Sequence, residues 1–415
     1  MSGYEPSWDT TTKHNGLERR STRLRTTPAN SVDSETREAW AIPTGQGVDA
    51  HGHVQQPLVA AIDGGGTKTL FLLATADGTV IGIGRGGPLN ALFVSPDEAI
   101  RSVQQAATGA LREAGMERGD VALLYASAPG ASRDIVSAGI DGLVLPARLE
   151  TAGDEMAVLT GALVDEPGVV VLAGTGSFAV GRGRRRDCDS QAGDASRRRV
   201  ATRHRIVTRG GWGPLLGDEG SAYAIGLAAL RAVALAFDSR GEHTCLCDMA
   251  LEHFSAPRAW SLATMPMSRE QIASFAVRVS EASAAGDSVA SEILAQAGRD
   301  LGRLGVSVLR ELAERSATGE PVEAEAEPES ESGVGYGRRT LAVLTGGVSR
   351  AAARLVEAFR DEISSFSPDV QIVPPQYSPA GGALLMALEI AGLRAFGTVP
   401  AGMRASAEAR SELRA

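Results

Sequence analysis

The sequence predicts an α/β fold made of two copies of one α/β unit, each offering a glycine-rich loop to a shared cleft. One observation is the run of strand, glycine loop and strand over residues 59–74, with a third strand over Val80–Ile83. The second is that this pattern restarts at Gly168–Ala173, where another glycine loop leads into another strand. A dinucleotide-binding or Walker-type loop would instead lead into a helix. The two hairpins are therefore explained together by a repeated unit, although two unrelated turns would also produce them.

Composition limits the class of protein. The chain has 415 residues, 43% hydrophobic and 4% aromatic, with 49 glycines and a net charge of −9. An acidic chain with few aromatic side chains is not typical of a nucleic-acid binder. No apolar run is long enough to span a membrane. The three cysteines (Cys188, Cys245 and Cys247) cannot form a disulfide framework, so a cytoplasmic location is expected.

The first glycine loop carries the first candidate site. Glycines let the backbone approach a ligand, and their exposed N–H groups favour phosphate. Asp63 precedes the loop and can hold hydrated Mg²⁺. The three consecutive glycines, Gly64 to Gly66, are the part of the loop that suits a phosphate. A glycine-rich hairpin turn capped by an aspartate is the alternative interpretation.

The domain boundaries follow from changes in composition. We expect a disordered tail over residues 1–56, a first domain over 57–166, a second over 167–395 and a C-terminal tail over 396–415. Two insertions interrupt the second domain, an arginine-rich stretch over 184–205 and an acidic low-complexity stretch over 317–339. A nucleic-acid patch in the arginine-rich stretch is conceivable, but a solvated loop fits its lack of aromatic residues better.

The elements follow in order along the chain. Helices are predicted over Pro96–Ala114, Met156–Leu163, Ala222–Ala236 and Arg350–Ile363, and the last long helix starts near Pro379. Buried strands are predicted over Val121–Ala126 and Leu341–Thr345. The last helix begins with small residues, which permit close packing.

The second domain carries further candidate residues. The densest run of polar residues and glycines covers 210–221, where Trp212 suits a flat plate for a ring-shaped ligand. Asp218 or Glu219, at a helix start, can accept hydroxyl hydrogen bonds. A buried tryptophan and a helix cap are the alternative there. Gly346 and Gly347 would let a flat group lie on a helix start. In the first domain, Asp154 precedes a helix, a position that fits a helix cap.

These motifs, taken in order, resemble the N-acetylglucosamine kinases and the related BadF/BadG/BcrA/BcrD ATPases of the actin-like ATPase superfamily. The matching residues are Asp63–Thr67, Asn90, Gly153–Asp154, Gly174–Ser177, Gly211–Gly213, Gly217–Tyr223, Thr345–Ser349 and Pro379–Ala383. The resemblance covers roughly residues 57–390. It implies two ribonuclease-H-like domains around a nucleotide and sugar cleft.

The resemblance also implies roles for individual residues. ATP and Mg²⁺ are the implied cofactors, with Asp63 near the metal and Asp154 as the base for the sugar's 6-hydroxyl. The remaining contacts to the nucleotide would come from Gly65, Gly66, Thr67, Lys68, Gly174, Gly176, Ser177, Gly346, Gly347 and Ser349. The sugar contacts would be Asn90, Asp154, Thr175, Gly211, Trp212, Gly213 and Asp218. The expected partners are a small amino sugar and ATP, with no nucleic acid or membrane, and the expected assembly is a homodimer.

Several functions stay open at this point. N-acetylglucosamine is the expected substrate, and a glucosamine kinase is the alternative within the family. An activator ATPase for 2-hydroxyacyl-CoA dehydratases needs cluster-binding cysteines, for which none of the three cysteines lies in a suitable context. A sugar or nucleotide sensor would be expected to have lost Asp63, Asp154 or a glycine loop. The sequence departs from the family pattern at two places. Lys68 would affect the part of the site that binds phosphate, and the arginine-rich insertion would affect the choice of substrate.

Overall fold

The structure is a computed structural model that describes residues 47–48, 54–55, 57–90, 94–130, 132–183, 206–317, 340–395 and 397–414. All of these belong to one compact unit, Gly45–Ala415. The arginine-rich insertion, nearly all of the acidic insertion and most of the predicted N-terminal tail lie outside the described residues. Within that predicted tail, the described part is a short antiparallel pair, β1 (Gly47–Val48) and β2 (Val54–Gln55).

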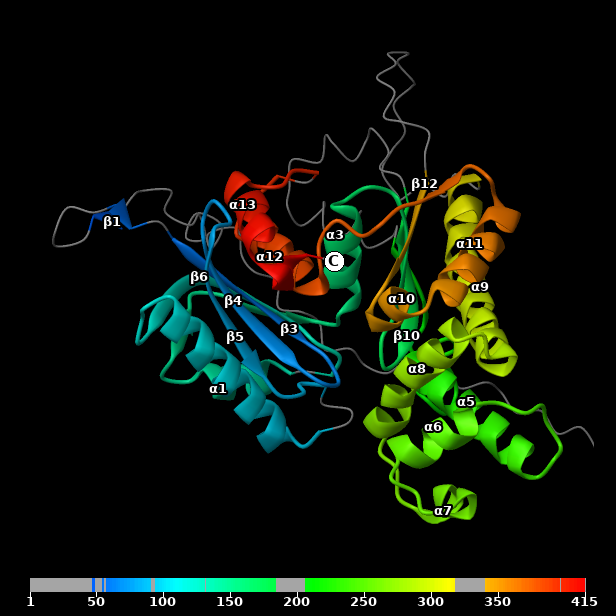
Figure 1. Cartoon of the computed structure of the whole chain (residues 1–415). Coiled ribbons are helices and arrows are strands. Elements are labelled where there is room, and N and C mark those ends of the chain that lie inside the picture. The colour runs from blue at the N-terminus through cyan, green and yellow to red at the C-terminus, as the bar shows by residue number, and fades with distance from the viewer. Residues whose placement is uncertain are drawn as a thin grey trace, which may run out of the picture. The chain divides into compact units, whose positions relative to one another are not determined.

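The first sheet has the strand order β5-β4-β3-β6-β7, and β8 pairs with β6 (Figure 1). Its strands are β3 (Leu58–Gly64), β4 (Thr69–Thr75), β5 (Val80–Gly86), β6 (Gly119–Ser127), β7 (Val144–Pro146) and β8 (Leu149–Ala152). The strands β3, β4 and β5 form an antiparallel meander, whereas β6 runs parallel to β3. The predicted strand, loop, strand and strand opening is therefore confirmed.

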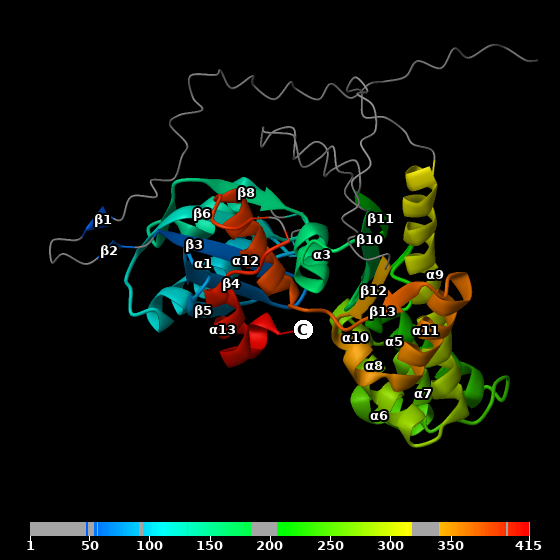
Figure 2. The ribbon, with the colours of Figure 1, turned by 90° about the horizontal axis from the view of Figure 1, so that it is seen from above.

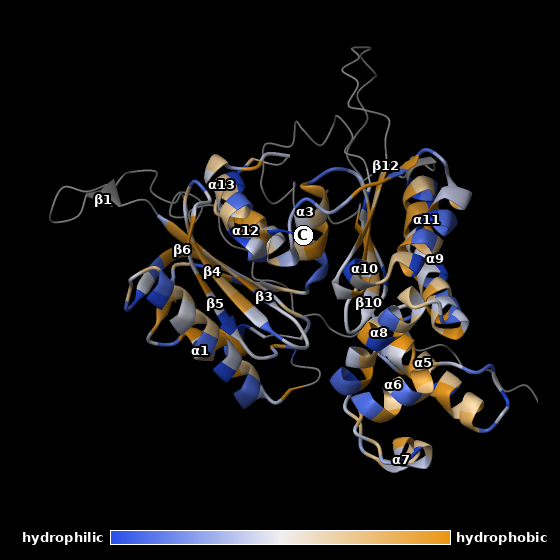
Figure 3. Ribbon diagram, viewed as in Figure 1, coloured by the Kyte–Doolittle hydropathy of each residue, from blue (hydrophilic) through white to orange (hydrophobic). Residues whose placement is uncertain are grey.

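The second sheet repeats this topology. Its order is β11-β10-β9-β12-β13, again with an antiparallel meander of three strands followed by parallel neighbours. The strands are β9 (Gly168–Ala173), β10 (Ser177–Arg182), β11 (Ile206–Gly210), β12 (Thr340–Thr345) and β13 (Val370–Ile372). Two units with one topology confirm the predicted α/β fold with a repeated ribonuclease-H-like half. Figure 3 shows the central strands of both sheets as largely hydrophobic.

Helices cover both faces of the first sheet, so its central strand is buried on both sides. Because side chains alternate along a strand, Ala60 and Ile62 of β3 pack with α1 (Pro96–Glu113) and α2 (Arg133–Ile140). Val59 and Ala61 face the other way and pack with α12 (Pro379–Ile390) and α13 (Ala401–Ala409). A strand that is buried on both faces requires a continuous run of apolar residues, because neither face alternates with polar ones.

The second sheet is covered mainly by a group of helices on one face. Val169, Val171 and Ala173 of β9 share a core with α5, α6, α8, α9 and α11. These helices and their neighbours are α5 (Ala222–Phe237), α6 (Leu246–His253), α7 (Ala259–Thr264), α8 (Arg269–Ala284), α9 (Ser288–Ala317), α10 (Gly347–Ala351) and α11 (Ala353–Phe366). The single helix predicted over 350–363 is instead two helices, because Ala352 leaves helical geometry with φ −132° and ψ 86°.

Helix α3 (Glu155–Leu163) lies between the two cores (Figures 1 and 2). Its residues from Ala157 to Leu163 are all buried, and it packs against α12 on one side and β9 and β10 on the other. The contact with α12 is close enough that a Cβ on Gly382 would lie 1.9 Å from the Ala157 carbonyl oxygen. The predicted close packing of the last long helix is thus confirmed.

The C-terminal segments return to the first sheet, which the predicted boundaries did not anticipate. Those boundaries placed α12 in the second domain and residues 396–415 in a tail. The structure packs α12 against β3 and buries Met403 of α13 and Leu413 completely in the core of the first sheet. Leu413 belongs to the short 3-10 helix η4 (Ser411–Leu413). Among the described residues, no helix has the length and apolarity that crossing a bilayer requires.

Candidate active site

The first glycine loop is an open turn between β3 and β4. Gly64 pairs with Thr69, and the Gly65 N–H donates to the Lys68 carbonyl oxygen at 2.9 Å. Nothing lies within 4 Å of a Cβ built on Gly66, and Thr67 is exposed. At Gly64, by contrast, a Cβ would lie 2.6 Å from the Leu89 side chain. The loop is therefore anchored at its base and accessible at its tip.

Asn90 is held against this loop although it is distant in sequence. The backbone N–H groups of Leu89 and Asn90 both donate to the Gly65 carbonyl oxygen, at 3.0 and 3.2 Å. The Thr69 hydroxyl donates to the Gly87 carbonyl oxygen at 2.7 Å and ties the same two segments together. The structure thus brings the predicted sugar-contacting Asn90 next to the predicted phosphate-contacting loop.

Two carboxylates meet at the same edge of the first sheet. Strands β3, β6 and β8 run parallel, so Asp63 pairs with Ser127, and Ser127 pairs with Ala152. The Ala128 N–H donates to the Ala152 carbonyl oxygen at 3.0 Å. Asp154 follows two residues after β8. The carboxyl ends of these parallel strands therefore place Asp63 and Asp154 at one edge of the sheet, near enough for the Asp154 charge to act on Asp63.

Both acids have a raised affinity for protons. Burial raises the pKa of Asp63 to about 7, the Asp154 charge adds to the rise, and Lys68 partly offsets it. Burial also raises the pKa of Asp154 to about 6, with a further contribution from Glu155, while the residue's own backbone N–H lowers it. Carboxylates whose pKa values are raised by burial and by a nearby charge are enriched at functional sites.

Asp154 does not serve as the helix cap that its position suggests. It occupies the N-cap of α3, but its φ of −79° and ψ of −13° are helical and its side chain makes no capping hydrogen bond. An N-cap residue that stabilises a helix has extended geometry, as Ser221 does at α5. The carboxylate is therefore available for chemistry, on a helix that is fixed by burial.

Asp63, with Asp154 nearby, also fits a magnesium ion that is bound together with a nucleotide. Mg²⁺ in such sites uses one or two carboxylates, and water and phosphate oxygens complete its shell. No group of three or more His, Cys, Asp and Glu side chains that could hold a metal exists among the described residues. A pair of neighbouring acids beside an open glycine loop suits a metal that arrives with phosphate, and does not suit an all-protein metal site.

The second glycine loop, between β9 and β10, is held from several directions. Ala173 pairs with Ser177, and the Gly174 N–H donates to the Gly176 carbonyl oxygen at 2.9 Å, so that Thr175 lies at the tip. The Gly174 carbonyl oxygen accepts from the Ala222 N–H at 2.9 Å. The Ser177 carbonyl oxygen accepts from the Gly211 N–H at 3.0 Å. The predicted phosphate loop and the predicted sugar segment thus form one hydrogen-bonded unit.

Asp218 is buried, and each of its carboxylate oxygens has a hydrogen-bond donor within this unit. It is 3% exposed and has a positive φ of 60°. One carboxylate oxygen accepts from the Ser177 N–H at 3.2 Å, and the other pairs with the Arg269 guanidinium at 2.7 Å. Sequence reasoning missed Arg269, because a single arginine at the start of an ordinary amphipathic helix carries no motif.

Trp212 stands on the surface, so the buried-tryptophan alternative is wrong. Its exposed fraction is 74%, and Leu215 and Leu216 beside it are also exposed. Gly211 and Gly213 on either side have φ values of 71° and 81°, which other residues adopt only with strain. The indole ring is therefore available as an apolar plate.

The third glycine pair lies beside the second loop. Gly346 follows β12 with a φ of 104°, and a Cβ there would lie 2.3 Å from the Ala173 carbonyl oxygen. Gly347 has no atom within 4 Å of its Cβ position, so space is open above it. The Ser349 hydroxyl donates back to the Gly346 carbonyl oxygen at 2.8 Å.

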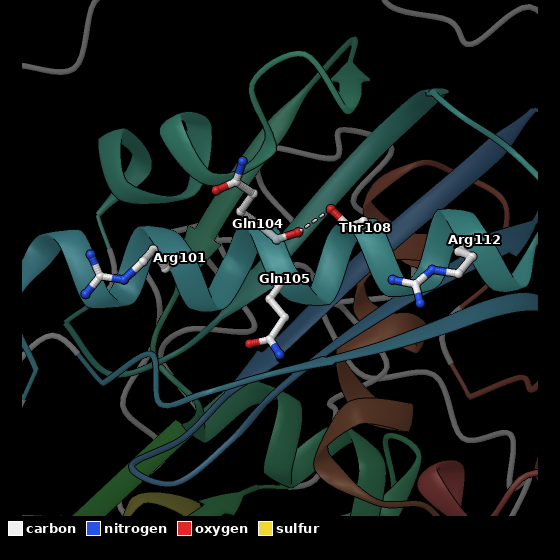
Figure 4. A pocket seen from close by; sticks show the side chains of 5 residues that line it. All are labelled: Arg101, Gln104, Gln105, Thr108 and Arg112. Carbon is white, nitrogen blue, oxygen red and sulfur yellow. Dashed lines mark hydrogen bonds between the residues drawn. The ribbon is translucent and has the colours of Figure 1, made fainter.

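A separate concavity of about 420 Å³ lies along the exposed face of α1 (Figure 4). Its lining residues are Arg101, Gln104, Gln105, Thr108 and Arg112. None of the predicted site residues lines this concavity. Its polar lining is what the solvent-facing side of a surface helix normally carries.

Two halves with this topology, each with a glycine hairpin loop, define the fold of the actin-like ATPases. The chain belongs to the BadF/BadG/BcrA/BcrD ATPase family, whose sequence model matches residues 61–197 and 199–387.

Characterised relatives are sugar kinases. The chain is 26% identical over 337 residues to the N-acetylmuramic acid/N-acetylglucosamine kinase of Clostridium acetobutylicum, covering 79% of this chain and 97% of the relative. It is 26% identical to the glucosamine kinase of Vibrio cholerae over 61% of this chain and 81% of that one. It is also 28% identical to the N-acetyl-D-glucosamine kinase of Dictyostelium discoideum, over 53% of this chain and 59% of that one.

A solved structure supports the fold. A Chromobacterium violaceum protein provisionally assigned as an N-acetylglucosamine kinase matches with a TM-score of 0.57 at 24% identity, covering 80% of this chain and 99% of its own.

Proposed function

We propose that this protein is an ATP-dependent kinase that phosphorylates the 6-hydroxyl of N-acetyl-D-glucosamine. The observation that carries the proposal is Asp154. Its carboxylate is free of a capping bond, lies beside Asp63 at the end of the parallel strands, and has a pKa raised to about 6. A base with such a pKa is largely ionised at neutral pH and still accepts a proton readily.

Phosphoryl transfer depends mainly on positioning and charge stabilisation. In the proposed complex, the N–H groups of Gly65 and Gly66 with Thr67 and Lys68 bind the phosphates from one side. Gly174, Gly176 and Ser177 bind them from the other, while Gly346, Gly347 and Ser349 flank the adenosine. The openness of the first loop's tip and of the space above Gly347 supports this assignment.

The chemical step is the attack of the sugar's 6-oxygen on the γ-phosphorus, in line with the leaving ADP oxygen. Asp154 accepts the 6-hydroxyl proton as the new O–P bond forms. Asp63, with a pKa raised to about 7, suits a place beside a cation, because the cation favours its ionised form. Mg²⁺ held there would neutralise charge on the transferring phosphoryl group.

The sugar would lie between Asn90 and the segment from Gly211 to Asp218. Trp212 provides an exposed apolar plate for the sugar ring or its acetyl group. Asp218 accepts hydroxyl hydrogen bonds with the lone pairs that Ser177 and Arg269 leave free, since a carboxylate can accept about four. Gly211, Gly213 and Thr175 complete the contacts.

The relatives' names support an amino sugar and leave two substrates to compare, N-acetylglucosamine and glucosamine. The test is ATP turnover with Mg²⁺ by the purified protein, without sugar and with N-acetylglucosamine, glucosamine or glucose. We expect the largest stimulation with N-acetylglucosamine. Stimulation by glucosamine alone would move the assignment to the other amino sugar, and turnover that no sugar affects would contradict the kinase proposal.

A further inference from the structure

Arg269 connects the helical part of the second half to the centre of the proposed sugar site. It is the first residue of α8, where a capping box between Ser268 and Gln271 fixes the backbone. Its guanidinium lies 2.7 Å from one carboxylate oxygen of Asp218. The two side chains are 17% and 4% exposed, so solvent screens this pair only weakly.

The Asp218 carboxylate is fixed at both oxygens. The Ser177 N–H holds Oδ1 at 3.2 Å, and Arg269 holds Oδ2. A carboxylate held by one donor can rotate about its last bond, whereas two donors on different oxygens define the direction of its plane. The remaining lone pairs then point in set directions, which is what recognition of a hydroxyl pattern needs.

The ion pair also lies directly against the second glycine loop. A Cβ on Gly176 would lie 2.8 Å from the Arg269 guanidinium nitrogen and 2.9 Å from Asp218 Oδ1. The ion pair therefore fills the space beside Gly176 of the second loop.

The position of Arg269 is not explained by helix stability. The N-terminus of a helix carries a partial positive charge that disfavours a cation. An arginine in the first turn of α8 opposes this charge, and the partner that compensates for it is Asp218.

We propose that Arg269 is a positioning residue for the sugar: it orients the Asp218 carboxylate so that its free lone pairs receive the sugar hydroxyls. This inference rests on the proposed amino-sugar kinase function. Arg269 touches neither the phosphates nor the sugar in this assignment, and it acts through Asp218.

The experiment compares Arg269→Gln and Arg269→Lys with Arg278→Gln as a matched control. Arg278 lies on the same helix and pairs with Glu252 and Glu281 on the surface. Three quantities are measured for each protein: the thermal midpoint, the dissociation constants of N-acetylglucosamine and of ADP–Mg²⁺ measured separately by calorimetry, and kcat/KM for the sugar.

For Arg269→Gln we expect sugar affinity and kcat/KM to fall roughly 10- to 100-fold, because small misplacements have large effects on positioned groups. ADP affinity should change less than about threefold, and Arg278→Gln should leave all three quantities near the wild-type values. Arg269→Lys keeps the cation without the planar fork, so it should fold and lose about three- to tenfold in sugar affinity.

Equal losses of sugar and ADP affinity in Arg269→Gln, or unchanged sugar affinity, would overturn the positioning role. If Arg269→Gln does not fold, Arg269→Lys decides, because full sugar affinity in it would leave charge compensation as the whole role. Failure of the kinase proposal itself is seen separately, as a wild-type protein that neither binds nor phosphorylates an amino sugar.

Discussion

Asp154 combines an unusual helix position with an unusual proton affinity. Asp154 occupies the N-cap position of helix α3 but makes no capping hydrogen bond, and the residues of α3 from Ala157 to Leu163 are all buried. A catalytic carboxylate benefits from such a support, because the surrounding packing limits its movement. The cost to α3 is the missing cap bond, which typically contributes about 1 kcal/mol to stability.

Asp154→Asn should therefore abolish catalysis without unfolding the protein. We expect sugar phosphorylation to fall about 10²- to 10⁴-fold, the usual contribution of a general base. Substrate binding should be largely kept, because the amide has nearly the same shape. Steady-state kinetics and sugar binding measure the two effects, and Asp134→Asn, an exposed first-turn aspartate on α2, is the control. Full activity in Asp154→Asn would exclude the residue as the base.

The pKa values predict opposite pH dependences for activity and stability. The proposed base, Asp154, can accept a proton only when it is ionised, so kcat/KM should rise as the pH rises through about 6. A further rise near pH 7 is expected if Asp63 must ionise to hold the proposed cation. Folded-state pKa values above the unfolded value of 3.8 mean that the folded protein binds more protons. These two groups therefore lower the free energy of unfolding as the pH rises from about 4 to 7.

Urea denaturation and kinetics across this pH range measure the two dependences together. In Asp63→Asn, the free energy of unfolding should fall less steeply with pH than in the wild type, because the asparagine does not titrate. If the wild type gains stability relative to Asp63→Asn as the pH rises from about 4 to 7, the raised pKa of Asp63 is contradicted.

At the level of elements, the first two glycine loops each join two antiparallel strands, whereas Gly346 and Gly347 link strand β12 to helix α10. Gly346 has a φ of 104° and stands against the Ala173 carbonyl oxygen, whereas Gly347 is open. The backbone geometry requires a glycine at position 346, whereas Gly347 leaves room for a ligand. Neighbouring glycines with different constraints allow a matched pair of substitutions.

Gly346→Ala should destabilise the protein by more than about 1 kcal/mol, because the positive φ and the close carbonyl both resist a side chain. Gly347→Ala should change stability by less than about 0.5 kcal/mol. If adenosine lies above Gly347, the methyl group should raise KM for ATP. Thermal unfolding and ATP kinetics of both variants separate these effects, and an unchanged ATP KM in a stable Gly347→Ala would argue against that contact.

The sequence predicted the elements that have strong local signals. The strands of both hairpins are apolar runs beside glycine loops, so the sequence pattern predicts them. The structure adds α2, β8 and β11, which the predicted element order lacked. These elements are short, and β8 is stabilised by its pairing with β6 and not by its own sequence pattern. Arg269 was missed for the same reason, since its role depends on a contact across 51 residues.

At the scale of the whole molecule, the chain crosses from the first sheet to the second and then returns. The sequence predicted the two units but not the return, because an apolar helix such as α12 does not reveal which sheet it covers. The residues after it look polar, and only the buried Met403 and Leu413 tie them to the first core. Such long-range packing leaves no local pattern.

Met403→Ala therefore tests whether the C-terminal segment is part of the fold. We expect a loss of about 2 to 5 kcal/mol, as for other buried large-to-small changes. Leu145→Ala is the control, because Leu145 is 72% exposed and its truncation should cost less than about 0.5 kcal/mol. Equal stabilities of the two variants in urea would show that the segment does not support the core.

The proposed reaction is the transfer of a phosphoryl group from ATP to an amino sugar by the two halves together. The most direct measurement is identification of the product by ³¹P and ¹H NMR, after the wild-type protein has been incubated with ATP, Mg²⁺ and N-acetylglucosamine. We expect stoichiometric formation of ADP and of a sugar phosphate whose phosphorus couples to the protons on carbon 6. ADP and inorganic phosphate with unchanged sugar would contradict it.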